Sequence, residues 1–186
     1  MMIKLNAQQF MQVLPEIINK GGAIYHRPIF PLVHLGLEND IDEEYCKKHN
    51  IPIFRVKRLG GAIVSNIDDF DFVIVNKTTN SRKVPLILEK LIHLLVSKNV
   101  TVSVENNDIL CDGYKTASYS YREVPGGIYT AIHISMKVDL DLIKNICTKE
   151  MKKSPKGLCN FGITYEDIEK LIQEINLWWK NPGKFW

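Results

Sequence analysis

The spacing of hydrophobic residues predicts five helices in this chain. In residues 84–98, leucines and isoleucines recur every three or four positions, which is the period of an amphipathic helix with one apolar stripe. Residues 6–19 show the same spacing, and a pair of glycines follows as a stop signal. Thr164 is placed to cap a further helix, with Asp167 three positions on as an acidic variant of the capping box. The predicted helices are 6–19, 42–49, 84–98, 140–147 and 164–178.

Short apolar runs bounded by turn residues predict the strands. Asp112-Gly113 lies between two β-prone runs and predicts a tight turn, because both residues tolerate positive φ. The predicted strands are 23–25, 31–35, 53–56, 62–65, 70–75, 100–104, 109–110, 116–121 and 129–138, and the last four supply the main antiparallel sheet. No repeat or linker composition interrupts the pattern. The expected fold class is therefore α+β, one domain over residues 1–186, with a mixed and mostly antiparallel sheet flanked by helices.

Composition and charge are those of an ordinary globular protein. Hydrophobic residues make up 45% of the 186 and charged residues 24%, which is enough for one sizeable core. The net charge of +3 is too small and too evenly spread to indicate nucleic acid as a partner. No apolar stretch approaches the ~20 residues of a membrane span, and the N-terminus lacks a signal-peptide pattern. We therefore expect no membrane association and a cytoplasmic location.

The cysteines and histidines form no metal or disulfide motif. His26 and His34 are isolated on mixed strands, where a structural role is more common than a ligand contact. The four cysteines have no paired spacing such as Cys-x-x-Cys: Cys46, Cys111, Cys147 and Cys159. We expect neither a disulfide framework nor a bound transition metal.

Lys115 is the leading candidate for chemistry. It comes just past the Asp112-Gly113 turn, at the head of a strand of small and aromatic residues. A lysine fixed on a sheet points in one defined direction, which suits a cation that meets one phosphate or carbonyl oxygen. The alternative, from the residues alone, is a hairpin whose lysine faces water.

A series of short motifs follows in a fixed order along most of the chain. They are Gly36 to Asp40, Arg55 to Val64, Asp108 to Lys115, Ser120 to Glu123, Val138 to Leu140, Lys156-Gly157 and Gly162 to Glu166. This order and spacing resemble the lipoate-protein ligase and biotin ligase superfamily. Its members carry a Gly-x-x-Gln-Asn element, a Ser-Gly-Gly-Gly-Ala-Val turn and an aspartate-glycine-x-lysine hairpin. The resemblance implies their catalytic-domain fold, which is similar to class II aminoacyl-tRNA synthetases.

The resemblance also implies activation or transfer of an acyl group. Family members bind lipoate or octanoate in an apolar tunnel, and the ligases join it to AMP from ATP, with Mg²⁺, before passing it to a lysine of a lipoyl-carrier domain. Lys115 would be the catalytic residue, stabilising the phosphate and carbonyl oxygens of the acyl-adenylate. The residues expected to bind ATP, lipoate or lipoyl-AMP are Arg55, Lys57, Arg58, Gly60, Gly61, Ala62 and Asp108.

The chain departs from the family pattern at several positions of the expected pocket. The usual arginine of the first element is Leu37, which removes a bidentate phosphate contact. A carboxylate pair, Asp68-Asp69, replaces Gly-Asn and would repel a nucleotide. The other replacements are Arg58 for serine, Leu59 for the first turn glycine, Ser65-Asn66 for His-Asp and Ala131-Ile132 for His-Gly.

These departures leave two further functions open. In octanoyltransferases, a cysteine beside the lysine takes the acyl group from a carrier protein without ATP, and Cys147 follows Asp139-Leu140 near that position. The other alternative is a catalytically degenerate relative that binds a ligand or partner, with the tryptophans near the C-terminus as a contact surface. We expect the accessory C-terminal domain of bacterial ligases to be absent, as in octanoyltransferases and two-protein ligases.

Overall fold

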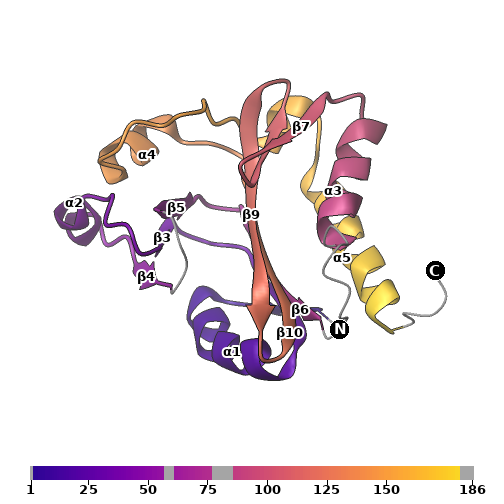
Figure 1. Cartoon of the computed structure of the whole chain (residues 1–186). Helices are drawn as coiled ribbons and strands as arrows, with labels where there is room; N and C mark the ends of the chain where they lie inside the picture. Colours follow the sequence, from indigo (N-terminus) through magenta and orange to yellow (C-terminus); the bar gives the residue numbers. More distant parts are fainter. Residues whose placement is uncertain (1, 57–60, 77–85, 181–186) are drawn as a thin grey trace.

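The strands form two separate sheets (Figure 1). The computed structural model describes residues 2–56, 61–76 and 86–180. Its strands are β1 (Met2–Leu5), β2 (Gly22–His26), β3 (Leu32–Leu35), β4 (Ile53–Arg55), β5 (Ala62–Ser65), β6 (Phe70–Asn76), β7 (Val102–Glu105), β8 (Asp108–Cys111), β9 (Tyr114–Val124) and β10 (Gly127–Ile134). The larger sheet has seven strands in the order β1-β2-β6-β10-β9-β8-β7, and the smaller has three in the order β4-β3-β5.

The pairing confirms the expected mixed and mostly antiparallel arrangement. Only β1–β2 and β3–β4 are parallel among the described pairs. The predicted turn joins β8 to β9, with φ of 48° at Asp112 and 83° at Gly113. β1 was not predicted, because four residues at the edge of a sheet are too few to show a period. The predicted strand 129–138 ends earlier, at Ile134.

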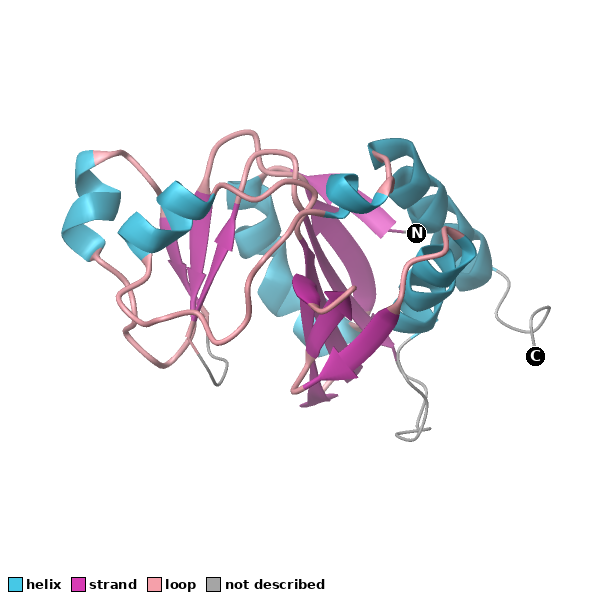
Figure 2. Cartoon of the chain, turned by 90° about the horizontal axis from the view of Figure 1, so that it is seen from above, coloured by secondary structure: helices cyan, strands magenta, loops and turns pink. Residues whose placement is uncertain are grey.

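The helices cover both sheets (Figure 2). They are α1 (Ala7–Lys20), α2 (Glu43–Lys48), α3 (Leu86–Ser97), α4 (Leu140–Ile146) and α5 (Tyr165–Lys180), with a short 3₁₀ helix, η1 (Leu158–Phe161). Buried residues of α3 and α5 pack on one face of the larger sheet, and α1 packs on the other. The helices α2 and α4 pack with the smaller sheet around a separate core. None of the described helices is long and apolar enough to cross a membrane.

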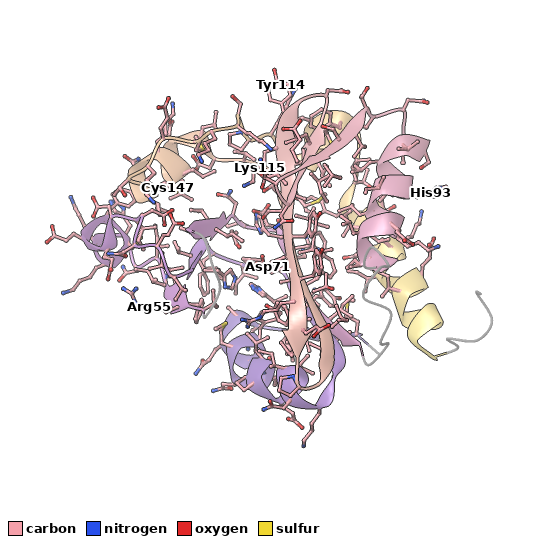
Figure 3. The ribbon with its side chains drawn as sticks, viewed as in Figure 1. Arg55, Asp71, His93, Tyr114, Lys115 and Cys147 are labelled. Atoms are coloured by element: carbon pink, nitrogen blue, oxygen red, sulfur yellow. The ribbon has the colours of Figure 1, made fainter. Side chains whose placement is uncertain are left out.

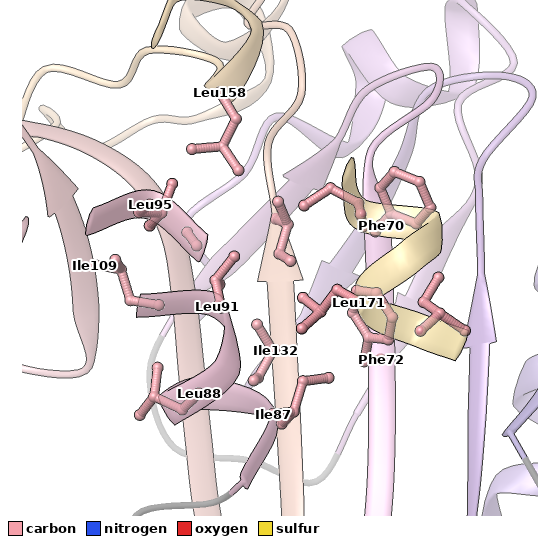
Figure 4. Packing of buried hydrophobic residues seen from close by; sticks show 14 of the residues in the cluster. Phe70, Phe72, Ile87, Leu88, Leu91, Leu95, Ile109, Ile132, Leu158 and Leu171 are labelled. Carbon is pink, nitrogen blue, oxygen red and sulfur yellow. The ribbon is translucent and has the colours of Figure 1, made fainter. Parts of the chain in front are cut away.

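The strand β6 contributes to two cores at once. Phe70 and Phe72 pack with the leucines of α3 and α5 (Figure 4), whereas Val73 and Val75 pack beneath α1. A strand covered on both faces needs apolar residues at nearly every position, which explains the continuous run in the sequence. Asp71 is the exception. Because side chains alternate along a strand, it lies on the same face as Val73 and Val75.

The start of α5 is held by the predicted reciprocal cap. The backbone N–H of Thr164 donates to Asp167 Oδ2 at 2.9 Å, and the backbone N–H of Asp167 donates to Thr164 Oγ1 at 3.2 Å. Lys98, at the end of α3, lies 3.1 Å from Asp167 Oδ1. The hydrogen bond from the Thr164 N–H lowers the pKa of the Asp167 carboxyl, and the hydrogen bond from Lys98 lowers it further by a smaller amount. The cap therefore joins α5 to α3 as well as ordering its first turn.

Replacing Asp167 with alanine is expected to lower the free energy of unfolding by about 1 kcal/mol at neutral pH, the usual cost of a lost helix cap. The folded-state pKa of Asp167 is below its unfolded value, so its stabilisation is present above the unfolded pKa and is lost as pH falls through the folded pKa. Urea unfolding of the wild type and of Asp167→Ala at neutral and acidic pH would show a smaller difference in the free energy of unfolding in acid. Glu166→Ala, an exposed neighbour in the same turn, is the control. An equal loss in both variants would contradict this role.

Candidate functional site

A bulge in β9 determines where Lys115 points (Figure 3). Ile109 on β8 pairs with Ala117, but the next residue, Leu110, pairs with Lys115, so Thr116 is an extra residue between them. Ile109 and Ala117 both belong to the core beneath α3. The extra residue shifts Lys115 to the opposite face, because a bulge changes the alternation of side chains. Lys115 therefore lies on the face that also carries Asp71.

The backbone of Lys115 is held by the segment that precedes η1. The N–H of Lys115 donates to the carbonyl of Ser154 at 3.0 Å, and its own carbonyl accepts from the N–H of Lys156 at 2.9 Å. Gly157 follows, and a Cβ there would lie 2.4 Å from the carbonyl oxygen of Met136. The Lys156-Gly157 motif thus has a packing reason: only glycine lets this segment approach closely enough to fix Lys115.

The ammonium of Lys115 forms an ion pair with a second predicted site residue. Lys115 Nζ lies 2.8 Å from Asp108 Oδ1, and its side chain remains 39% exposed. Lys153 Nζ lies 3.6 Å from the other oxygen of Asp108 and 3.2 Å from Glu105. The structure therefore brings Lys115 and Asp108 together. The ammonium is fixed in place while part of it remains accessible to a substrate.

Cys147 lies near Lys115 at the end of α4, and its surroundings raise the pKa of its thiol. Its thiol is half-buried, and burial raises its pKa, with further increases from Asp40 and Cys46. The charge of Lys115 lowers the pKa of Cys147 without overcoming these effects. A thiol with a raised pKa is protonated at neutral pH and is a poor nucleophile.

The other predicted cations are not brought to Lys115. Arg55 Nη2 lies 2.7 Å from Glu43 Oε1, on the outer part of the smaller sheet, and 60% of its side chain is exposed. In Figure 3 it lies away from Lys115 and Cys147. Lys57, Arg58 and Gly60 lie outside the described residues.

The predicted glycine turn packs against a carboxylate. The N–H of Ala62 donates to Asp40 Oδ1 at 2.8 Å. A Cβ on Gly61 would lie only 1.8 Å from Asp40 Oδ2, so a larger residue would displace this side chain. The N–H of Ala62 is thus paired with Asp40 in this conformation, and the expected ligand binding by Ala62 stays a prediction. Binding of an acyl chain or phosphate at Gly61 stays a prediction.

A row of buried polar residues crosses the larger sheet beside this site. His26 and His133 are the cross-strand neighbours of Asp71 on β2 and β10. His133 Nδ1 lies 2.8 Å from Asp71 Oδ1, and His26 Nε2 lies 3.2 Å from Oδ2. From the smaller sheet, Ser65 Oγ donates to Asp71 Oδ2 at 2.9 Å, and His34 Nε2 lies 3.5 Å from the same oxygen. All five residues are buried.

The ionisation of this row follows from its geometry. Burial alone would raise the pKa of Asp71, but the adjacent His133 and the hydrogen bond from His34 hold it well below the usual range. Burial alone would lower the pKa of His133, but the charge of Asp71 and its hydrogen bond outweigh this effect and raise it. Burial lowers the pKa of His26, although the adjacent Asp71 acts in the opposite direction. Asp69, whose carboxylate accepts the N–H groups of Asn66 and Met136, has its pKa raised to about 6 by burial.

The sequence did not indicate this row. The available signals were isolated residues: Asp71, a single carboxylate within an apolar run, and the histidines His26 and His34, for which a structural role is the more common one. The partners come from four other strands, and short-range spacing cannot reveal that. Two of the positions that depart from the family pattern, Ser65 and Asp69, lie in or beside the row. Asp68 pairs with Arg27 at 2.8 Å and Asp69 is buried, and repulsion of a nucleotide by these carboxylates stays a prediction.

Comparison with solved structures identifies the fold. A lipoate protein ligase from Thermoplasma acidophilum, described as putative and solved with bound lipoic acid, matches with a TM-score of 0.73 and 16% identity over 92% of this chain and 82% of its own. Plasmodium falciparum LipL1 in complex with lipoate matches with a TM-score of 0.78 and 13% identity over 99% of this chain and 61% of its own. A biotin protein ligase from Aquifex aeolicus, with biotin and ATP, matches with a TM-score of 0.54 and 12% identity over 95% and 68%. The lipoate and biotin ligase fold expected from the sequence is confirmed.

The sequence comparison agrees with the structural one. No curated protein matches this chain. The family model for the lipoyl protein ligase A/B catalytic domain matches residues 33–178, which include Lys115, Asp108 and every member of the row around Asp71 except His26. The chain belongs to the lipoyl protein ligase A/B catalytic-domain family.

Proposed function

We propose that this protein activates a lipoyl or related acyl group with ATP and passes it to a lysine on a lipoyl-carrier domain. The observation that carries the proposal is the placement of Lys115: its backbone is fixed on both sides, its ammonium is held by Asp108, and part of it remains exposed. Family membership supports the reaction class. The lipoate bound in two neighbours and the ATP in a third support the substrates.

In this reaction the acyl carboxylate attacks the α-phosphorus of ATP, and pyrophosphate leaves. The amine of the carrier lysine then attacks the carbonyl carbon of the acyl-adenylate, AMP leaves, and an amide bond remains. Negative charge develops on phosphate and carbonyl oxygens in both steps. Lys115 would stabilise that charge, and its pairing with Asp108 keeps the ammonium oriented before the substrate arrives. Magnesium would accompany the ATP.

The acceptor and the cellular setting follow from the same proposal. An archaeal bipartite lipoate protein ligase, studied with its E2 lipoyl domain, is among the structural neighbours and supports a lipoyl-carrier protein as the acceptor. We propose further that residues 1–186 act as one catalytic domain. We also propose a cytoplasmic location.

A ligand-binding relative without ligation activity is the second candidate. Two groups expected to contact the nucleotide instead contact carboxylates of the protein: Arg55 pairs with Glu43, and the Ala62 N–H donates to Asp40. Leu37, in the place of the family arginine, is 67% exposed. The two functions differ in whether an acyl-adenylate forms, and this difference can be measured.

Replacing Lys115 with alanine is expected to reduce lipoylation of a purified lipoyl domain by about 100-fold or more, in line with the loss of one fixed group that stabilises a transition state. The assay is the mass increase of the lipoyl domain in the presence of lipoate and MgATP. Lys153→Ala, which removes the other lysine beside Asp108, is the matched control and should retain activity within a few-fold. Wild-type turnover by Lys115→Ala would remove Lys115 from the reaction. No turnover by the unaltered protein would favour the second candidate.

The Cys147→Ser variant separates ATP-dependent ligation from transfer of an acyl group through a cysteine. Since the pKa of the Cys147 thiol is raised, we expect this variant to lipoylate the acceptor at close to the wild-type rate. Cys159→Ser, another partly buried cysteine, serves as the control. Transfer from an octanoyl-carrier protein without ATP, lost in Cys147→Ser alone, would establish the octanoyltransferase reaction instead.

A further inference from the structure

Three metal-binding side chains meet between the two sheets. His26 comes from β2 and Asp71 from β6 of the larger sheet, and His34 comes from β3 of the smaller sheet. Each offers one ligand atom, and these atoms all lie within 4.8 Å of one another. The Nε2 atoms of His26 and His34 lie 3.2 and 3.5 Å from Asp71 Oδ2.

The imidazole of His26 is not satisfied by the protein. The residue has no exposed surface, and neither of its ring nitrogens has a hydrogen-bond partner of good geometry in the described part of the chain. A buried polar group without a hydrogen bond is costly, and folded proteins rarely contain one without a bound water or ion. The Nε2 atom lies 3.2 Å from Asp71 Oδ2 without forming a hydrogen bond of good geometry with it.

We propose that His26, His34 and Asp71 bind one divalent transition-metal ion of the zinc class, which joins the smaller sheet to the larger. Zinc–nitrogen and zinc–oxygen bonds of about 2.0–2.1 Å at tetrahedral angles place two ligand atoms roughly 3.3 Å apart. The separations of 3.2 and 3.5 Å from Asp71 Oδ2 match this spacing, and the three ligand atoms lie within 4.8 Å of one another. Two imidazoles and a carboxylate suit zinc and its neighbours better than Ca²⁺ or Mg²⁺, which favour oxygen ligands.

The surrounding residues orient these ligands. His133 Nδ1 lies 2.8 Å from Asp71 Oδ1, the oxygen that faces away from the other two histidines. Ser65 Oγ donates to Asp71 Oδ2 at 2.9 Å. Carboxylate ligands in metal sites are commonly fixed by such hydrogen bonds. His133 is in turn fixed by Ser135 Oγ, 3.1 Å from its Nε2, so the carboxylate is held by a chain of contacts.

Aromatic side chains shield the site from water. The ring of Phe10, on α1, lies 4.7 Å from that of His26 in an edge-on arrangement. The ring of Phe54, on β4, lies 6.0 Å from that of His34. A dry shell strengthens binding to the anionic carboxylate and slows the release of an ion. Three protein ligands leave a fourth position for water or another small ligand.

The proposal is tested by removing metal from the full-length protein with a chelator and dialysing it against Zn²⁺. We expect one equivalent to be retained and the unfolding midpoint to rise by roughly 5–10 °C at 100 times the dissociation constant. His26→Ala and Asp71→Asn should lose the equivalent, while His133→Gln should bind about 10–100-fold more weakly. The control is His93→Ala, an exposed histidine on α3 labelled in Figure 3, which should bind as the wild type does.

Two results of the binding assay would overturn the site. One is no retained zinc in the wild type, and the other is an unchanged equivalent in His26→Ala and Asp71→Asn. If these variants do not fold, X-ray absorption spectroscopy of the zinc-loaded wild type identifies the atoms that bind the zinc and so tests the site. Nitrogen and oxygen neighbours with imidazole scattering support the site, whereas sulfur neighbours at about 2.3 Å would place the zinc on the cysteines and reject it.

Discussion

The arrangement of the two sheets depends on the interactions of one buried carboxylate, that of Asp71. It lies in the middle of an otherwise apolar strand and receives partners from both sheets. Removing one partner from a buried ion pair typically costs about 3–5 kcal/mol, because the remaining charge is left without compensation. This cost applies to His133, which is hydrogen-bonded to Asp71 and whose pKa Asp71 raises, while Ser65 adds a hydrogen bond from the smaller sheet.

The same row accounts for several departures from the family pattern. Ser65 stands where the family pattern described above has histidine, and its hydroxyl donates a hydrogen bond to Asp71. Asp69 stands where that pattern has asparagine, and its carboxylate accepts two backbone N–H groups at the turn and at the end of β10. The substitutions are thus coupled through one buried network. The network lies next to Lys115, whose charge affects the pKa of His133, so the polar interior and the candidate catalytic lysine share one face of the sheet.

The sequence predicted the parts of the molecule that depend on local patterns. Hydrophobic period located the helices, and the Asp112-Gly113 turn and the Thr164 cap followed from residue chemistry. The motif order pointed to Lys115 and to the family. The bulge at Thr116, which sets the direction of Lys115, has no local signature because it depends on the register with β8. The row around Asp71 was missed for the same reason, since its members lie far apart in the chain and meet only when the sheets are paired.

The central claim is that Lys115 belongs to a pocket that holds an acyl-adenylate. Calorimetric titration with a non-hydrolysable lipoyl-AMP mimic, with lipoate and biotin titrated in parallel, tests it most directly. The account predicts one bound mimic per chain, with an affinity above that of lipoate alone, because the phosphate adds its interaction with the ammonium. No measurable binding of the mimic or of either acid would contradict it and would indicate that this chain keeps the fold of a ligase without its pocket.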